Sequence, residues 1–117
     1  MHCYFQTNNI ENSFLRFDFK EHRVLPTNYT ILSYAREKEN HPKNWVIEGS
    51  NDGQHWAILD EEKDCTFLNG NSRVYTFSIQ NENMQEFRYL QIRQNGENCA
   101  GQHHLLFNSI EFYGDYF

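Results

Sequence analysis

Hydrophobic and polar residues alternate along several short stretches of this sequence, as they do in strands that cover a core on one face. Leu15, Phe17 and Phe19 share one face of the stretch 13–20, and Arg16 and Asp18 lie on the other. No stretch of about a dozen residues has apolar side chains at helical spacing. Further strands are predicted at 29–36, 45–50, 55–59, 73–79, 87–93 and 105–113. The pattern therefore predicts an all-β sandwich of about seven or eight short strands.

Turn residues separate these stretches. Pro26 and Asn28 are expected to break the chain before the strand at 29–36. Asn51-Asp52-Gly53 predicts a tight turn, because Asn and Gly tolerate the positive φ that such turns need. Acidic residues between 60 and 64 and the polar runs 37–43 and 95–104 are predicted to be surface loops.

Length and composition indicate one domain, spanning residues 1–117. Aromatic residues make up 16% of the chain, so bulky flat side chains must supply much of the burial. We therefore expect Trp45 and Trp56 to fill the sandwich core, together with Tyr89, Phe107 and Phe112. Tyr116 and Phe117 follow Gly114 and are expected to be available to dock onto a neighbour.

The net charge of −6 argues against nucleic acid as a partner, because such binding depends on clustered Lys and Arg. No apolar run has the roughly 18 to 20 residues that a membrane span requires, and the first residues do not resemble a signal peptide. The sequence therefore predicts a soluble, unsecreted protein in the cytoplasm, without a membrane partner.

Candidate chemistry is sparse. Cys3, Cys65 and Cys99 match neither a disulfide framework nor a zinc knuckle, so we expect thiols in a reducing compartment. The pair His103-His104 lacks a second Cys/His cluster to complete four ligands, so no metal and no cofactor are predicted. No nucleophile has an organised base and orienting group, which predicts that the chain is not an enzyme.

Several segments, taken in order, resemble the discoidin or coagulation-factor type C domains of the galactose-binding-like superfamily. They are residues 17–20, 29–31, 41–45, 48–53 with Trp56, 87–90 and 110–114. The resemblance implies an antiparallel jelly-roll β-sandwich. It is strongest to intracellular discoidin-like domains of protists and of proteins that carry BTB or ubiquitin-ligase modules. The sequence also lacks the cysteine pair of the secreted domains, which agrees with a reducing compartment.

The sequence departs from the resembled family at its beginning. Family members have a further strand region before the segment that corresponds to 4–7, and this region is missing or very short here. Three alternatives stay open: a partner covers the exposed sheet edge, the charges of the edge prevent pairing, or the sequence is a fragment. Some family members bind calcium with an early loop and a carboxylate at the position of Glu111, a site that is predicted to be incomplete.

The resemblance favours a non-catalytic protein-interaction or scaffold module that docks onto a larger intracellular assembly. A cytoskeletal or ciliary assembly is a variant of this hypothesis. The binding surface is predicted on the end loops, at His41, Lys43, Asn95, Glu97, Asn98, Gln102, His103 and His104.

The alternative hypothesis is a lectin-like carbohydrate-binding domain, the activity from which the superfamily takes its name. Sugar sites combine an exposed aromatic side chain with convergent polar groups. The loop 95–103 offers the polar groups but no aromatic residue. Phospholipid binding would need apolar loop tips beside basic residues, and these loops are polar or acidic.

Overall fold

The computed structural model describes residues 5–6, 14–33, 43–65, 68, 74–96, 106–107 and 109–117, with side chains for all but 5–6 and 106–107. The regular elements in these ranges are strands. They are β1 (Phe5–Gln6), β2 (Phe14–Asp18), β3 (Val24–Leu32), β4 (Trp45–Ser50), β5 (Ala57–Glu62), β6 (Val74–Ser78), β7 (Tyr89–Gln94), β8 (Leu106–Phe107) and β9 (Ser109–Tyr116).

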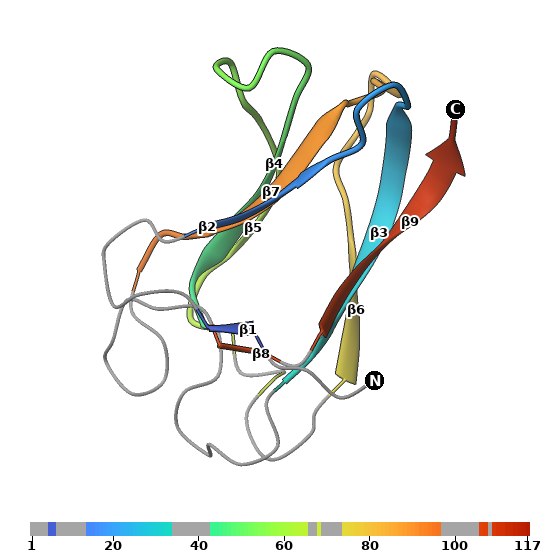
Figure 1. Ribbon diagram of the computed structural model, residues 1–117. Helices are drawn as coiled ribbons and strands as arrows, with labels where there is room; N and C mark the ends of the chain where they lie inside the picture. Colours follow the sequence, from blue (N-terminus) through green and yellow to red (C-terminus); the bar gives the residue numbers. More distant parts are fainter. Residues whose placement is uncertain are drawn as a thin grey trace.

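The strands form two larger sheets that face each other as the layers of a sandwich (Figure 1). One sheet has the order β2-β7-β4-β5 and the other the order β6-β3-β9, and β1 pairs with β8 in a short ribbon. All of these pairs are antiparallel. The predicted all-β, antiparallel sandwich is therefore confirmed.

The core lies between the layers and contains aromatic and β-branched side chains from both. Trp45 of β4 and Tyr29 of β3 are 0% exposed, and the indole Nε1 of Trp45 donates a hydrogen bond to the Tyr29 hydroxyl at 2.8 Å. Leu15 and Phe19 pack against this core, as their alternation predicted. Cys65 is also buried in it, whereas Cys3 and Cys99 lie outside the described residues.

Predicted strand boundaries were wrong at three places. The strand predicted at 105–113 is replaced by the short β8 and by β9, which continues to Tyr116. Strand β3 begins at Val24 and includes Pro26, and its pairing with β9 shifts register between Pro26 and Asn28. Such an irregularity accommodates a residue that has no N–H for the ladder. Strand β5 continues through the acidic run that was predicted to be a loop, because Asp60 accepts a hydrogen bond from the buried Tyr29 hydroxyl at 2.5 Å.

Two aromatic residues predicted for the core lie on the outer face of the four-stranded sheet instead. Trp56 and Tyr89 are only partly buried and pack against each other, with ring centroids 6.3 Å apart. A Cβ on Gly49 would meet the ring of the core residue Phe87, so Gly49 faces inward, and it pairs with Ala57. Because successive residues point to opposite faces, Trp56 points outward.

The prediction for Phe112 is confirmed in part, because this side chain is partly buried and packs against the core. The side chain of Phe107 lies outside the described residues. Tyr116 and Phe117 are exposed, at 60% and 56%, and Tyr116 stacks on His22 with ring centroids 4.8 Å apart. The described part of the chain contains no helix with the length and apolarity needed to cross a membrane.

Candidate functional site

The turn between β4 and β5 is held by its own polar side chains. Gly53 has a φ of 76°, a left-handed conformation that glycine adopts without strain. The Ser50 hydroxyl accepts a hydrogen bond from the Gly53 N–H at 2.9 Å. Asp52 Oδ1 accepts two more, from the N–H groups of Gln54 and His55, both at 2.8 Å. The predicted tight turn is confirmed, and its conformation is fixed.

Asp52 and His55 also form a charged pair on the surface of this turn. The Nδ1 atom of His55 lies 2.6 Å from Asp52 Oδ2. Hydrogen bonds from the backbone and ring of His55 hold the pKa of Asp52 far below its usual value. The same carboxylate raises the pKa of His55 above 6.5. The pair therefore favours the protonated form of the imidazole at the turn.

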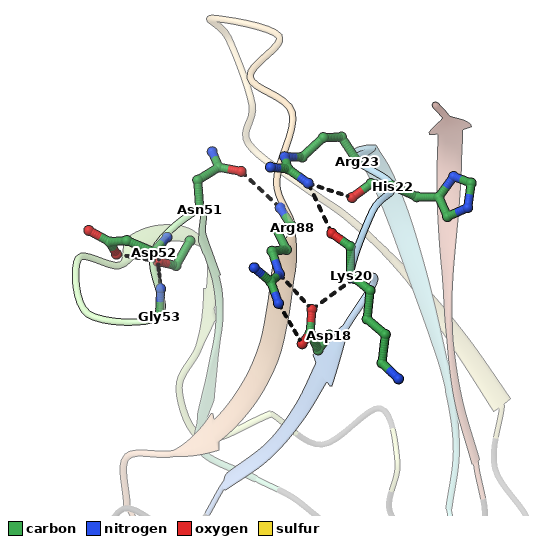
Figure 2. Close-up of polar contacts among 9 residues, drawn as sticks. Asp18, Lys20, His22, Arg23, Asn51, Asp52, Gly53 and Arg88 are labelled. Atoms are coloured by element: carbon green, nitrogen blue, oxygen red, sulfur yellow. Dashed lines mark hydrogen bonds and ion pairs between the residues drawn. The ribbon is translucent and has the colours of Figure 1, made fainter.

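The turn is also tied to two other segments at this end of the sandwich (Figure 2). The Asn51 side chain accepts a hydrogen bond from the Arg88 N–H and donates one to the Glu86 carbonyl, both at 2.9 Å. The Arg88 guanidinium contacts both carboxylate oxygens of Asp18, at 2.9 and 3.1 Å, which lowers the pKa of Asp18. These contacts join the end of β2, the turn and the segment before β7.

A pocket of about 400 Å³ opens beside this turn, and we call it the turn-end pocket. It is lined by Gly49, Ser50, Asn51, Asp52, His55, Trp56, Ala57, Gln85 and Phe87. Its volume lies within the range of small-molecule sites. Two of its polar groups have no hydrogen-bond partner among the described residues: the Gln85 side-chain amide and the Nε2 atom of His55.

The turn-end pocket therefore suits a small neutral polar ligand. The Gln85 amide can donate and accept, and the imidazole of His55 can donate. Trp56 adds a partly exposed aromatic side chain to the lining. Across the described residues, no three His, Cys, Asp or Glu side chains are grouped so that they could hold a metal ion.

Two of the predicted binding residues lie near each other at the opposite end of β4. The Lys43 ammonium lies 3.7 Å from the Asp64 carboxylate, and the Asn95 side chain donates to Glu61 Oε2 at 3.0 Å. Asn44 links the two positions, because its carbonyl accepts the Asn95 N–H at 3.3 Å. Both side chains are thus engaged with acidic neighbours.

The other predicted binding residues lie outside the described residues, and their role stays a prediction. They are His41, Glu97, Asn98, Gln102, His103 and His104. Sequence reasoning missed the turn-end pocket, because it assigned the turn a purely structural role. The sequence did contain a signal for a binding site, because a carboxylate, an imidazole and a tryptophan occur within five residues, at Asp52, His55 and Trp56.

No family model matches the sequence. The chain is 30% identical over 94 residues to the E3 ubiquitin-protein ligase Ufd4 of Drosophila melanogaster, and 30% identical over 93 residues to the E3 ubiquitin-protein ligase hecd-1 of Caenorhabditis elegans. These matches cover 78% and 79% of the chain but only 3% and 4% of the ligases. A peptide-N(4)-(N-acetyl-beta-glucosaminyl)asparagine amidase of Arabidopsis thaliana is 34% identical over 70 residues, 56% of the chain and 10% of that protein.

Solved structures with the same architecture include carbohydrate-binding modules. CpGH89CBM32-5 from Clostridium perfringens, in complex with GalNAc-beta-1,3-galactose, superposes with a TM-score of 0.70 at 11% identity, over 95% of this chain and 75% of that one. CBM62 from Clostridium thermocellum Xyl5A gives a TM-score of 0.71 at 16% identity, over 97% and 76%. The chain therefore has the galactose-binding-like jelly-roll fold, which is related to that of discoidin domains.

Proposed function

We propose that this chain is a non-catalytic carbohydrate-recognition module and that the turn-end pocket is its sugar site. The observation that carries the proposal is the pocket itself. In it, the Gln85 side-chain amide and the Nε2 atom of His55 have no hydrogen-bond partner among the described residues. The fold, shared with a carbohydrate-binding module that was solved in complex with GalNAc-beta-1,3-galactose, supports the same ligand class.

The pocket suits a pyranose because it combines fixed polar groups with an aromatic edge. Asn51 and Asp52 are already used to hold the turn, so they fix the shape of the wall. Sugar hydroxyls would then exchange hydrogen bonds with Gln85 and His55, while the apolar face of the ring contacts Trp56. Preformed walls reduce the entropic cost of binding.

A glycan array followed by titration calorimetry tests this function. We expect millimolar to micromolar binding of galactose-type or N-acetylhexosamine-type sugars. The double variant Gln85→Ala/His55→Ala should abolish binding without unfolding the protein. The matched control is Lys43→Ala/Asn95→Ala, which alters the opposite end of β4 and should bind normally. If sugar binding is lost only in this control, the sugar site lies on the predicted loops and not in the turn-end pocket. A glycan array without any signal would refute the carbohydrate function.

A second candidate function is protein interaction within a larger assembly. The observation that favours it is sequence identity: 30% with the two ubiquitin ligases, compared with 11% and 16% with the carbohydrate-binding modules. In this hypothesis the chain is a substrate-binding or assembly module. Affinity capture from the source cells, with mass spectrometry, tests it. The cytoplasmic location and the cytoskeletal or ciliary variant stay predictions, to be tested by imaging the tagged protein.

A further inference from the structure

The outer face of the four-stranded sheet carries a cluster of aromatic rings and guanidinium groups in contact with one another. The Arg16 guanidinium lies between two rings, 4.9 Å from the centroid of Phe14 and 4.7 Å from that of Trp56. Trp56 in turn contacts Tyr89 at a tilt of 59°, and the Arg88 guanidinium is 4.8 Å from the Tyr89 ring. We call these five residues the cation–aromatic face. Each contact with a cation adds to the stability of the arrangement.

A series of hydrogen-bonded polar side chains on the neighbouring strands β7 and β4 orients Arg16. Its Nε atom donates to Gln91 Oε1 at 3.1 Å, and Gln91 in turn donates to Glu48 Oε1 at 3.0 Å. Both of these side chains are buried, at 4% and 6% exposure. Arg93 completes the series with a 2.9 Å contact to Glu48. The orientation of the Arg16 guanidinium is therefore fixed before any ligand arrives.

Arg16 differs from its arginine neighbours, because it has no acidic partner in the part of the chain that the structure describes. Arg88 is paired with Asp18 and Arg93 with Glu48. Among the described residues, neither terminal nitrogen of Arg16 has an acceptor, and the residue is exposed. A guanidinium fixed by stacking, with its outer donors unused, matches the geometry of a carboxylate.

We propose that Arg16 binds a carboxylate side chain of an extended segment from a partner protein, which pairs along the free edge of β2. Strand β2 is at the end of the sheet order and pairs with β7 alone among the described strands. A residue directly opposite Arg16 on an added strand would place its Cβ about 5 Å from the Cβ of Arg16. A long acidic side chain such as Glu at that position would extend over the same face of the sheet as the Arg16 side chain. The residue two positions along would face Phe14, which is 49% exposed.

A protein segment fits this surface better than an acidic sugar does. The cation–aromatic face lies on the open face of a sheet, whereas sugars and other small ligands bind in concave sites. Its Trp, Tyr and Arg side chains are the types that dominate protein-interface hot spots. The net charge of −6 does not oppose an acidic segment at close range, because salt screens charges beyond about 8 Å at physiological ionic strength.

A binding assay with a designed peptide tests the proposal. The probe is a short, fluorescently labelled peptide of alternating Val and Thr with a central Glu that has Val two positions away on each side. We expect saturable binding that weakens with added salt. A peptide with Gln in place of Glu should bind on the order of tenfold to a hundredfold more weakly, the range for a hydrogen bond to a charged group.

Variants of the protein identify the contact. Arg16→Gln should lose the preference for the Glu peptide, and Arg16→Glu should reverse it, so that a peptide with a central Lys now binds better. This gain of binding cannot come from misfolding. The matched control is Arg23→Gln, because the Arg23 guanidinium contacts the main-chain carbonyls of Lys20 and His22 rather than the rings of the face.

The outcomes separate this proposal from the sugar site. Gln85→Ala/His55→Ala should leave peptide binding unchanged, so a failed glycan array does not affect the result. Equal binding of the Glu and Gln peptides, or an unchanged preference in Arg16→Gln, would overturn the proposal. Binding of galacturonate oligosaccharides at Arg16 in the absence of any peptide binding would also overturn it and assign the face to acidic sugars.

Discussion

The two tryptophans stand on either side of one turn, yet they have opposite roles. Trp45, at the start of β4, is 0% exposed, donates a hydrogen bond to Tyr29 and packs edge-on against Phe77 at 5.4 Å. Trp56, just before β5, lies partly exposed on the outer face of the same sheet, against Arg16. The first is part of the core, and the second is partly exposed to solvent.

The difference shows that the position of a residue in the alternation of a strand, rather than its type, decides which aromatic side chain is buried. Trp45, Ile47 and Gly49 alternate on the inner face of β4. The β4–β5 pairing shifts register between Ile47 and Glu48 and then places Gly49 opposite Ala57. Because Trp56 precedes Ala57, it must point outward. Its size alone predicted burial, and this prediction was wrong.

The largest difference in stability is expected when each tryptophan is replaced by alanine. Trp45→Ala should lower the free energy of unfolding by about 3–5 kcal/mol, the range for removing a large aromatic side chain from a core. Trp56→Ala should cost only about 1 kcal/mol, mostly from its contact with Arg16. Urea titrations measure both. Equal losses would mean that Trp56 is a core residue after all.

Removing one tyrosine hydroxyl should have a smaller effect, and this effect should differ between the core and the outer face of the sheet. Tyr29→Phe should lower the free energy of unfolding by about 1–3 kcal/mol, because it leaves the Trp45 Nε1 and the Asp60 carboxylate without their shared partner. Its counterpart on the outer face is Tyr89→Phe, and no hydrogen bond of the Tyr89 hydroxyl occurs among the described residues. That variant should be nearly neutral by the same measurement, and a comparable loss there would contradict the contrast.

Glu62 of β5 should make the stability of the protein depend on pH. Burial, together with the neighbouring Asp60, raises the pKa of Glu62 from 4.5 to about 7. The folded state then holds a proton that the unfolded state has released, so stability should fall as the pH rises from about 4.5 to about 7. Glu62→Gln should remove this loss. Melting temperatures at pH 5 and pH 8 should therefore differ less in the variant than in the wild type.

The sequence predicted most of the strands because local alternation reports which face is buried. Strands β2, β4, β6 and β7 lie within a residue or two of the expected ranges. It misplaced the ends of β9, and it failed at β3 and β5. There, Pro26 and the acidic residues around Asp60 are local loop signals, but a register shift and the contact with Tyr29 accommodate them in strands. The turn-end pocket depends on segments joined across strands, at Asn51 and Arg88, which no local pattern contains.

The smallest expected effect is at the exposed turn beside Trp56, where a histidine titration can be followed directly. His55 should titrate above 6.5, because Asp52 stabilises the protonated ring at 2.6 Å. This interaction favours folding below pH 6.5 and is lost as the pH rises through the folded pKa. In Asp52→Asn, the His55 pKa measured by NMR should return toward its ordinary value, whereas in Glu62→Gln it should not change. A pKa unchanged by Asp52→Asn would show that the carboxylate does not hold the imidazole at the turn-end pocket.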